Sequence, residues 1–218
     1  MMKKEIGLLL VICLTAQMLA AQTIKSGTIK YSIERQAQIQ FSGKQLTQKM
    51  QTVDLLDFSD GYYRLICSLM PAEETVSGIN VSTGAAIMTA FYMPKERAVF
   101  QHMQSNGKHY GLVQNKTILT SIQPTGKMDS IMGFRVEEFT CLYNGETAQG
   151  WYCTSLPSMI SPFGNLGLPG ALLRFNSPAA VVQLLSIELN QVHEVKDLQL
   201  PADTKIVSKE EFMKESRQ

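Results

Sequence analysis

Residues 131–154, IMGFRVEEFTCLYNGETAQGWYCT, contain two runs of alternating apolar and polar residues separated by Asn144-Gly145. Asn-Gly tolerates the positive φ angles of a two-residue turn, so the two runs are predicted to pair as an antiparallel hairpin. Such a turn sets Cys141 opposite Ala148 and Cys153 opposite Val136. Because side chains alternate between the two faces of a strand, Cys141 and Cys153 should lie on opposite faces and form no disulfide.

The same period of two recurs along most of the chain. Ile29, Tyr31 and Ile33 alternate with polar residues, as do Leu185 and Ile187 near the other end. This pattern is typical of strands with one buried face. Further strands are predicted near residues 46–56, 62–69, 87–93, 97–103, 109–114, 117–122, 131–143, 146–153, 171–175 and 181–189.

Two other dipeptides, Asp60-Gly61 and Asn106-Gly107, separate neighbouring runs in the same way. The sequence therefore predicts a mainly β fold, an antiparallel meander that curls into a half-barrel-like sheet over its own side chains. One short C-terminal helix is expected, because Ser208-Lys209-Glu210-Glu211 matches a capping box. Residues 22–206 should form a single domain, and residues 207–218 a short helical tail.

Two segments interrupt the alternation. Residues 71–86 include Ser, Thr and Gly and show little alternation of apolar and polar residues, which predicts a long, mobile connection. At Glu137-Glu138 the apolar phase shifts from Val136 to Phe139, which predicts a bulge with an exposed pair of glutamates.

The amino terminus predicts export. Lys3 and Lys4 precede a mostly apolar run from Ile6 to Leu19, and Ala20-Ala21 follows. This order is typical of a secretory signal peptide over residues 1–21, cleaved before Gln22. The run is shorter than the roughly 20 residues that a membrane-spanning helix needs. We therefore expect a protein of the periplasm or the outer-membrane periphery with no membrane span.

The charge balance bears on the class of partner. Without residues 1–21 the chain carries equal numbers of acidic and basic side chains. A basic excess is the electrostatic footprint of nucleic-acid binding, so no nucleic-acid partner is expected.

After the second strand of the hairpin, the chain runs through PFGNLGLPGALL at residues 162–173. Pro169 restricts its own backbone and biases Leu168 toward an extended conformation, while Gly167 and Gly170 can adopt angles that other residues avoid. The leucines of this loop are too apolar for a solvated connection. We favour a plug that fills the end of the sheet, and the alternative is the mouth of a pocket.

These segments resemble the GLPGLI family of bacterial envelope proteins. Ile131-x-Gly133-Phe134 is similar to the family's I-x-G-Y element, and Leu200-Pro201 to its closing turn. The name motif matches the loop that includes Pro162, Gly167, Leu168, Pro169 and Gly170, preceded by the strand that carries Trp151. Val136 stands where the family has a cysteine, and Ala171-Leu172 replaces its final Leu-Ile. The resemblance implies an exported β domain and no particular activity.

Residues that could carry catalysis are few. None of the three histidines, His102, His109 and His193, stands beside a nucleophile or metal-ligand motif. His102-Met103 offers ligands for copper(I), but adjacent strand residues point to opposite faces. The cysteines include no C-x-x-C pair. We expect no catalytic residue, no metal and no cofactor.

The remaining expectation concerns function. A curled sheet covered by one helix can leave its concave side open, which favours a non-enzymatic binding module for an apolar or lipidated ligand. An accessory partner that docks on an outer-membrane transport or secretion component is the alternative, and copper binding or an enzyme is less favoured. A filled interior would remove the carrier interpretation. On the basis of the apolar alternation within the strands, the residues predicted to bind the ligand are Tyr63, Leu65, Phe91, Phe100 and Leu112.

Overall fold

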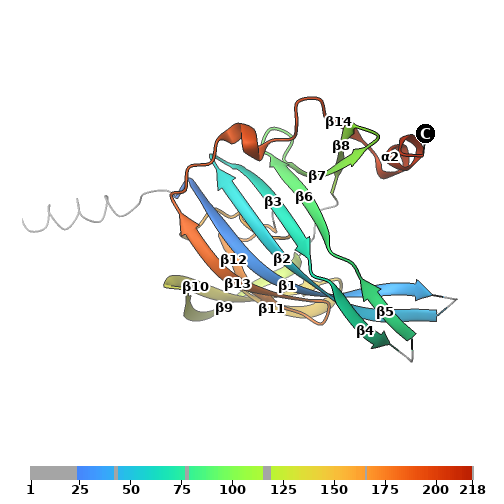
Figure 1. The fold of residues 1–218 in the computed structure, drawn as a ribbon. Helices are drawn as coiled ribbons and strands as arrows, with labels where there is room; N and C mark the ends of the chain where they lie inside the picture. The colour runs from blue at the N-terminus through green and yellow to red at the C-terminus, as the bar shows by residue number, and fades with distance from the viewer. Residues whose placement is uncertain (1–23, 42–43, 77–78, 115–118, 165, 218) are drawn as a thin grey trace, which may run out of the picture.

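The computed structural model describes residues 24–41, 44–76, 79–114, 119–164 and 166–217. The predicted signal peptide and its cleavage site lie outside these residues. The described chain is mainly β, as predicted, and forms one large curved sheet that does not close into a barrel (Figure 1). Its elements are β1 (Ser26–Phe41), β2 (Lys44–Ser59), β3 (Tyr62–Leu69), β4 (Ala72–Val76), β5 (Ile79–Thr83), β6 (Ala86–Met93), β7 (Ala98–Ser105), β8 (Lys108–Val113), β9 (Leu119–Ile131), β10 (Phe134–Tyr143), β11 (Glu146–Cys153), β12 (Ala171–Asn176), β13 (Ala180–Leu189), the 3-10 helix η1 (Val195–Leu198), β14 (Lys205–Val207) and α2 (Lys209–Glu215).

The strand order of the large sheet is β14-β8-β7-β6-β3-β2-β1-β13-β12-β11-β10-β9. Its pairs are antiparallel except for β14, which runs parallel to β8. The chain therefore starts in the middle of the sheet, builds one half outward through β8, and builds the other half from β9 back to β13. The first half ends at β14 and the second at the edge strand β9.

The three predicted hairpin turns are confirmed. The first residue of each turn has a φ angle of 47° at Asp60, 51° at Asn106 and 54° at Asn144, and the following glycine also has a positive φ. Cys141 pairs with Ala148 as expected. Cys67, Cys141 and Cys153 are free thiols.

A fourth turn corrects the predicted strand at 131–143. Met132 and Gly133 have φ angles of 51° and 83°, and Ile131 pairs with Phe134 across them. The strand before this turn, β9, extends over 13 residues. It includes Pro124, which an edge strand tolerates because one side of its backbone needs no partner.

Residues 71–86 are not the irregular connection predicted from their composition. β4 and β5 pair there as a separate two-stranded sheet, with Ala72 opposite Thr83. Thr75, Val76 and Ile79 are β-branched residues that favour extended backbone even where apolar alternation is weak.

The prediction at Glu137-Glu138 is also corrected. The pairing of β10 with β9 shifts between Glu137 and Phe139, but the extra residues belong to β9, because Glu137 pairs with Met128 and Phe139 with Pro124. Glu138 is buried, not exposed.

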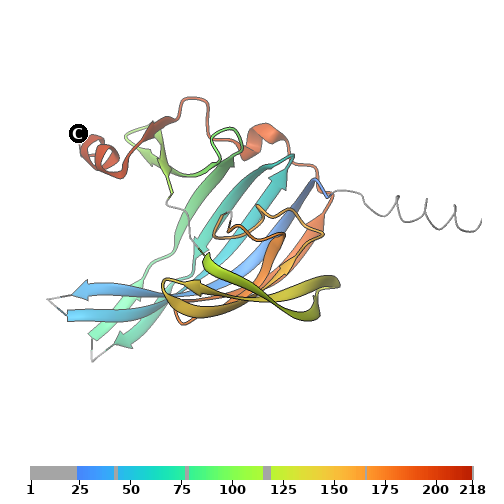
Figure 2. The same cartoon turned by 180° about the vertical axis from the view of Figure 1, so that it is seen from behind.

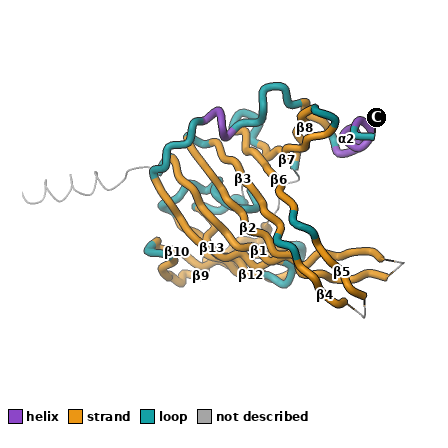
Figure 3. The backbone as a smooth tube through the Cα atoms, in the orientation of Figure 1, coloured by secondary structure: helices purple, strands orange, loops and turns teal. Residues whose placement is uncertain are grey.

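Helices are confined to the C-terminal part of the described chain (Figure 3). η1 contacts β2 and β3, and α2 contacts β8. The predicted capping box is confirmed: the Glu211 amide donates to Ser208 Oγ over 3.1 Å, and the Ser208 amide donates to Glu211 Oε2 over 2.8 Å. Within the described residues, no helix has the length and apolar character that a bilayer crossing requires.

Candidate functional site

The loop between β11 and β12 fills the inner side of the curved sheet (Figure 2). Leu156, Ile160, Leu166 and Leu168 are buried in one apolar cluster with residues from both halves of the sheet. Leu172 follows at the end of the loop and is fully buried. The loop is therefore a plug, and the interior beneath it is packed. The predicted ligand site in the concave side of the sheet is wrong, because the loop fills that side.

Backbone contacts hold the plug in place. The buried Tyr31 hydroxyl donates to the Leu172 carbonyl over 3.0 Å, and the Leu172 amide donates to the Ile160 carbonyl over 3.2 Å. A Cβ atom on Gly164 would lie 3.5 Å from the Tyr63 hydroxyl, so the loop also covers β3.

The residues singled out in the loop motif have different environments. Leu168, Gly170 and Pro162 are buried, and Trp151 is half-buried against the apolar cluster. Pro169 and Gly167 are exposed, and Gly167 has a φ angle of 76°.

The five residues predicted to bind a ligand do not share one face. Tyr63 and Leu65 lie in the core cluster, on the face that the loop covers, which we call the inner face. Strand pairing through Ala90 and Gln101 places Leu112 on the same face. Phe91 and Phe100 pair with each other on the opposite, outer face. Alternation therefore selected two separate groups of side chains.

Leu112 nevertheless lines an open groove. The loop reaches β7 at Val99, and the groove is lined by residues of β7, β8, β14 and α2 and of the segments next to them. We call this space the α2 groove. It has a volume of about 1050 Å³, and the apolar side chains that line it include Met103, Leu112, Val207, Phe212 and Met213.

The lining of the α2 groove is mixed: apolar side chains that include Met103 and Met213 stand beside the polar residues Gln114, Ser208, Lys209, Glu210 and Glu211. Val113, Ile206 and Met213 line it while remaining 58%, 50% and 43% exposed. The Gln101 side-chain amide donates to Met103 Sδ over 3.5 Å and to Met88 Sδ over 3.7 Å. Met88 is 44% exposed, so the apolar surface continues onto β6. Methionine side chains are flexible and adapt to irregular apolar partners.

Few contacts hold α2 over this groove. The Phe212 ring meets the Tyr110 ring edge-on at 5.3 Å, and Lys205 Nζ lies 2.5 Å from Glu215 Oε1. None of the residues of α2 is buried. A helix attached by so little buried surface opens at low free-energy cost.

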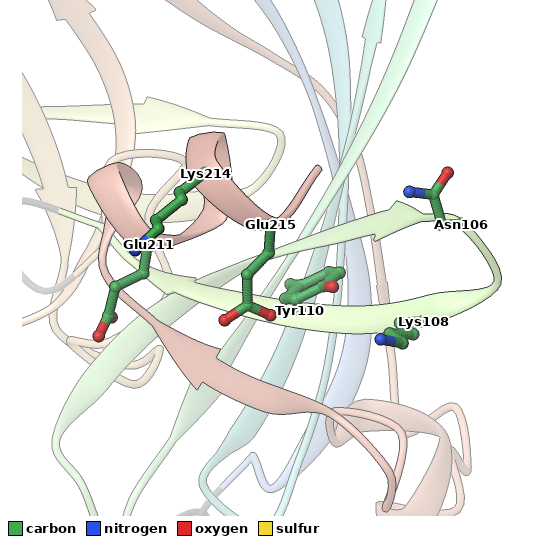
Figure 4. Close-up of a pocket in the computed structure, with 6 residues that line it drawn as sticks. All are labelled: Asn106, Lys108, Tyr110, Glu211, Lys214 and Glu215. Carbon is green, nitrogen blue, oxygen red and sulfur yellow. The ribbon is translucent and has the colours of Figure 1, made fainter. Parts of the chain in front are cut away.

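The opposite side of α2 is polar. Figure 4 shows Glu215 directed toward Tyr110, with Lys108 further along β8. Hydrogen bonding to Lys205 is the main cause of the lowered pKa of Glu215. The lining here mixes both signs of charge, so it selects neither anions nor cations.

On the outer face, a polar cluster joins residues that are distant in the sequence. Asp57 is buried and accepts hydrogen bonds from Thr28 Oγ1 and Arg64 Nη2, each over 2.8 Å. His193 Nε2 lies 3.0 Å from Thr28 Oγ1 and 3.7 Å from Asp57 Oδ1. In a catalytic triad, the carboxylate binds one ring nitrogen of the histidine, and the other ring nitrogen faces the nucleophile. Here one nitrogen faces both groups, and the arrangement anchors the chain after β13 to the sheet.

Glu138 and the cysteines provide no better nucleophile or base. Hydrogen bonds lower the pKa of Glu138, first among them one from Thr125 Oγ1 over 2.7 Å. Cys67 Sγ donates to Asp54 Oδ2 over 3.4 Å, and burial together with this carboxylate raises the pKa of Cys67 to about 12. A thiol with so high a pKa is inert. The described residues contain no group of three or more His, Cys, Asp or Glu side chains arranged to hold a metal ion.

Comparison with known proteins extends the description of the fold. No protein-family model and no curated protein matches this chain. A solved structure of PNGF-II superposes on 89% of this chain with a TM-score of 0.52 and 15% sequence identity. A second crystal form of PNGF-II gives a TM-score of 0.49 at 16% identity over 85% of this chain.

The chain spans about a third of the length of the PNGF-II chains, which it covers to 33% and 32%. At this level of identity the likeness concerns the fold alone. The fold and the site together define a class: an open, curved antiparallel sheet whose interior is packed by its own loop and which has a groove of mixed lining at one end.

Proposed function

We propose that this protein is an exported, non-enzymatic binding module of the GLPGLI type, and that the α2 groove binds an apolar ligand such as the acyl chain of a lipid or of a lipidated protein. One observation carries the proposal. The loop reaches Val99 on the inner face, whereas Met88 and Met213 are exposed beside the groove.

The physical chemistry of the groove supports an apolar ligand. Its exposed methionine, valine and isoleucine side chains lose contact with water when an acyl chain covers them, which contributes about 25 cal/mol for each Å² of apolar area buried. The loss of ligand freedom offsets much of this gain. We therefore expect micromolar affinity, equivalent to about −8 kcal/mol.

An accessory role on an outer-membrane transport or secretion component is the second candidate. The same methionines favour it, because they can repack around an apolar side chain of a protein partner. In that case the groove would bind a protein segment and would have little affinity for a free fatty acid.

The test is a titration of the mature chain, residues 22–218, with a fluorescent fatty acid. Val113→Glu and Met213→Glu place a charge in the groove and should weaken binding at least tenfold. Met128→Glu is the matched control, because Met128 is 47% exposed on β9 at the opposite edge of the sheet. Equal affinity in all four proteins, or no binding by the parent, would remove the proposal.

A further inference from the structure

Two of the three histidines of the chain lie side by side on the outer face. His102 of β7 and His109 of β8 place Nε2 and Nδ1 2.9 Å apart. Their rings are 12° from parallel, with centroids separated by 5.1 Å. Both side chains are half-buried, so a dissolved ion can reach them.

The hairpin between β7 and β8 fixes this pair. The Asn106-Gly107 turn sets Gln104 opposite His109 and His102 opposite Gly111. The two histidines are therefore diagonal neighbours on one face, within reach of each other. Met103 points to the other face and lines the α2 groove, so the pair is independent of that groove.

The separation of the two nitrogens matches a particular coordination geometry. Metal–nitrogen bonds to imidazole are about 2.0–2.1 Å long. Two such bonds at 90° place the nitrogens about 2.9 Å apart, and at the tetrahedral angle about 3.3 Å. The observed 2.9 Å is a hydrogen-bond distance, and it also equals the edge of a square-planar or tetragonal site, the geometry of Cu²⁺ and Ni²⁺.

We propose that His102 Nε2 and His109 Nδ1 form a binding site for a divalent transition-metal ion of tetragonal preference, with Cu²⁺ bound most tightly. Without metal, one of the two neutral rings donates a hydrogen bond to the other. When the ion binds, the donating ring shifts its proton to its other nitrogen, so both facing nitrogens become ligands without net proton release. Water completes the coordination.

The Phe91 ring meets His102 edge-on at 6.2 Å and borders the pair with apolar surface.

Isothermal titration calorimetry tests this inference. The untagged mature chain is titrated with CuCl₂ in the presence of glycine, which competes for the ion. His102→Asn and His109→Asn should each weaken binding at least tenfold. His193→Asn is the matched control, because it removes the one remaining histidine and leaves the pair intact. All variants share the amino terminus and every other donor, and circular dichroism checks that each is folded.

Electron paramagnetic resonance gives a second readout. The parent and His193→Asn should show one Cu²⁺ coupled to two imidazole nitrogens, and each pair variant should lose that two-nitrogen signal. Parental affinity in His109→Asn, or a parent signal from fewer than two nitrogens, would overturn the site.

Discussion

Gly170 packs directly against the backbone of Cys153: a Cβ atom on Gly170 would lie 2.0 Å from the Cys153 carbonyl oxygen. The end of β11 and the start of β12 therefore touch where the loop between them closes. Gly167 serves the loop differently, because its φ angle of 76° is unfavourable for other residues while its surroundings leave room for a side chain.

These two glycines should respond differently to substitution. Gly170→Ala should lower the free energy of unfolding by about 3 kcal/mol, because the backbone must move to admit the methyl group. Gly167→Ala should cost about 1 kcal/mol from backbone strain alone. Gly84→Ala is the control, because its added Cβ meets nothing within 4 Å and its φ is not positive. Urea unfolding of the three variants measures these changes in the free energy of unfolding. Equal decreases for Gly170→Ala and Gly84→Ala would contradict the prediction.

The hydrogen bond from Tyr31 to the Leu172 carbonyl should also contribute to stability. Tyr31→Phe leaves this buried carbonyl without its donor and should cost about 2 kcal/mol. Tyr62→Phe is the comparison, because Tyr62 is a half-buried residue at the start of β3. Similar denaturation midpoints for both variants would show that the Tyr31 bond does not hold the loop.

Glu138 should make the protein sensitive to acid. Its pKa is lowered in the folded state, so its stabilising effect is present above the ordinary value of 4.5 and is lost as the pH falls through the folded pKa. Glu138→Gln should therefore flatten the decline of unfolding free energy below about pH 4.5. If the unfolding free energy of Glu138→Gln falls below pH 4.5 as steeply as that of the parent, other carboxylates cause the decline.

The thiols should be unreactive in the folded protein. Burial raises the pKa values of Cys67 and Cys141, to about 12 for Cys67. Iodoacetamide at pH 8 should label these two residues slowly in the native protein and rapidly in urea, since the thiolate is the nucleophile. Fast labelling of Cys67 under native conditions would contradict its buried contact with Asp54.

Local chemistry explains what could be predicted from the sequence. Each of the turns at Asp60, Asn106 and Asn144 depends on two adjacent residues, and the capping box at Ser208 on four, so short-range patterns were sufficient. The packing of the loop followed from its leucines. The hairpin of β4 and β5 was missed because its residues lack apolar alternation.

The ligand-binding residues show why the rest was harder. Alternation groups side chains within one strand, and a two-residue turn carries that grouping to the next strand. Between Leu65 and Phe91, however, residues 71–86 intervene, so the relative phase of the two strands could not be derived. Thr28 and His193 are 165 residues apart, and no local pattern predicts that they meet. The His102–His109 pair could have been found from the register of the Asn106-Gly107 turn.

Photo-crosslinking of a diazirine-bearing fatty acid to the mature chain tests the central claim most directly, because peptide mapping reports where the ligand lies. The account predicts adducts at residues 101–113 and 206–213, around the α2 groove, which are lost in Val113→Glu and kept in Met128→Glu. Adducts confined to residues 154–173, inside the packed loop, or no specific adducts at all, would contradict it.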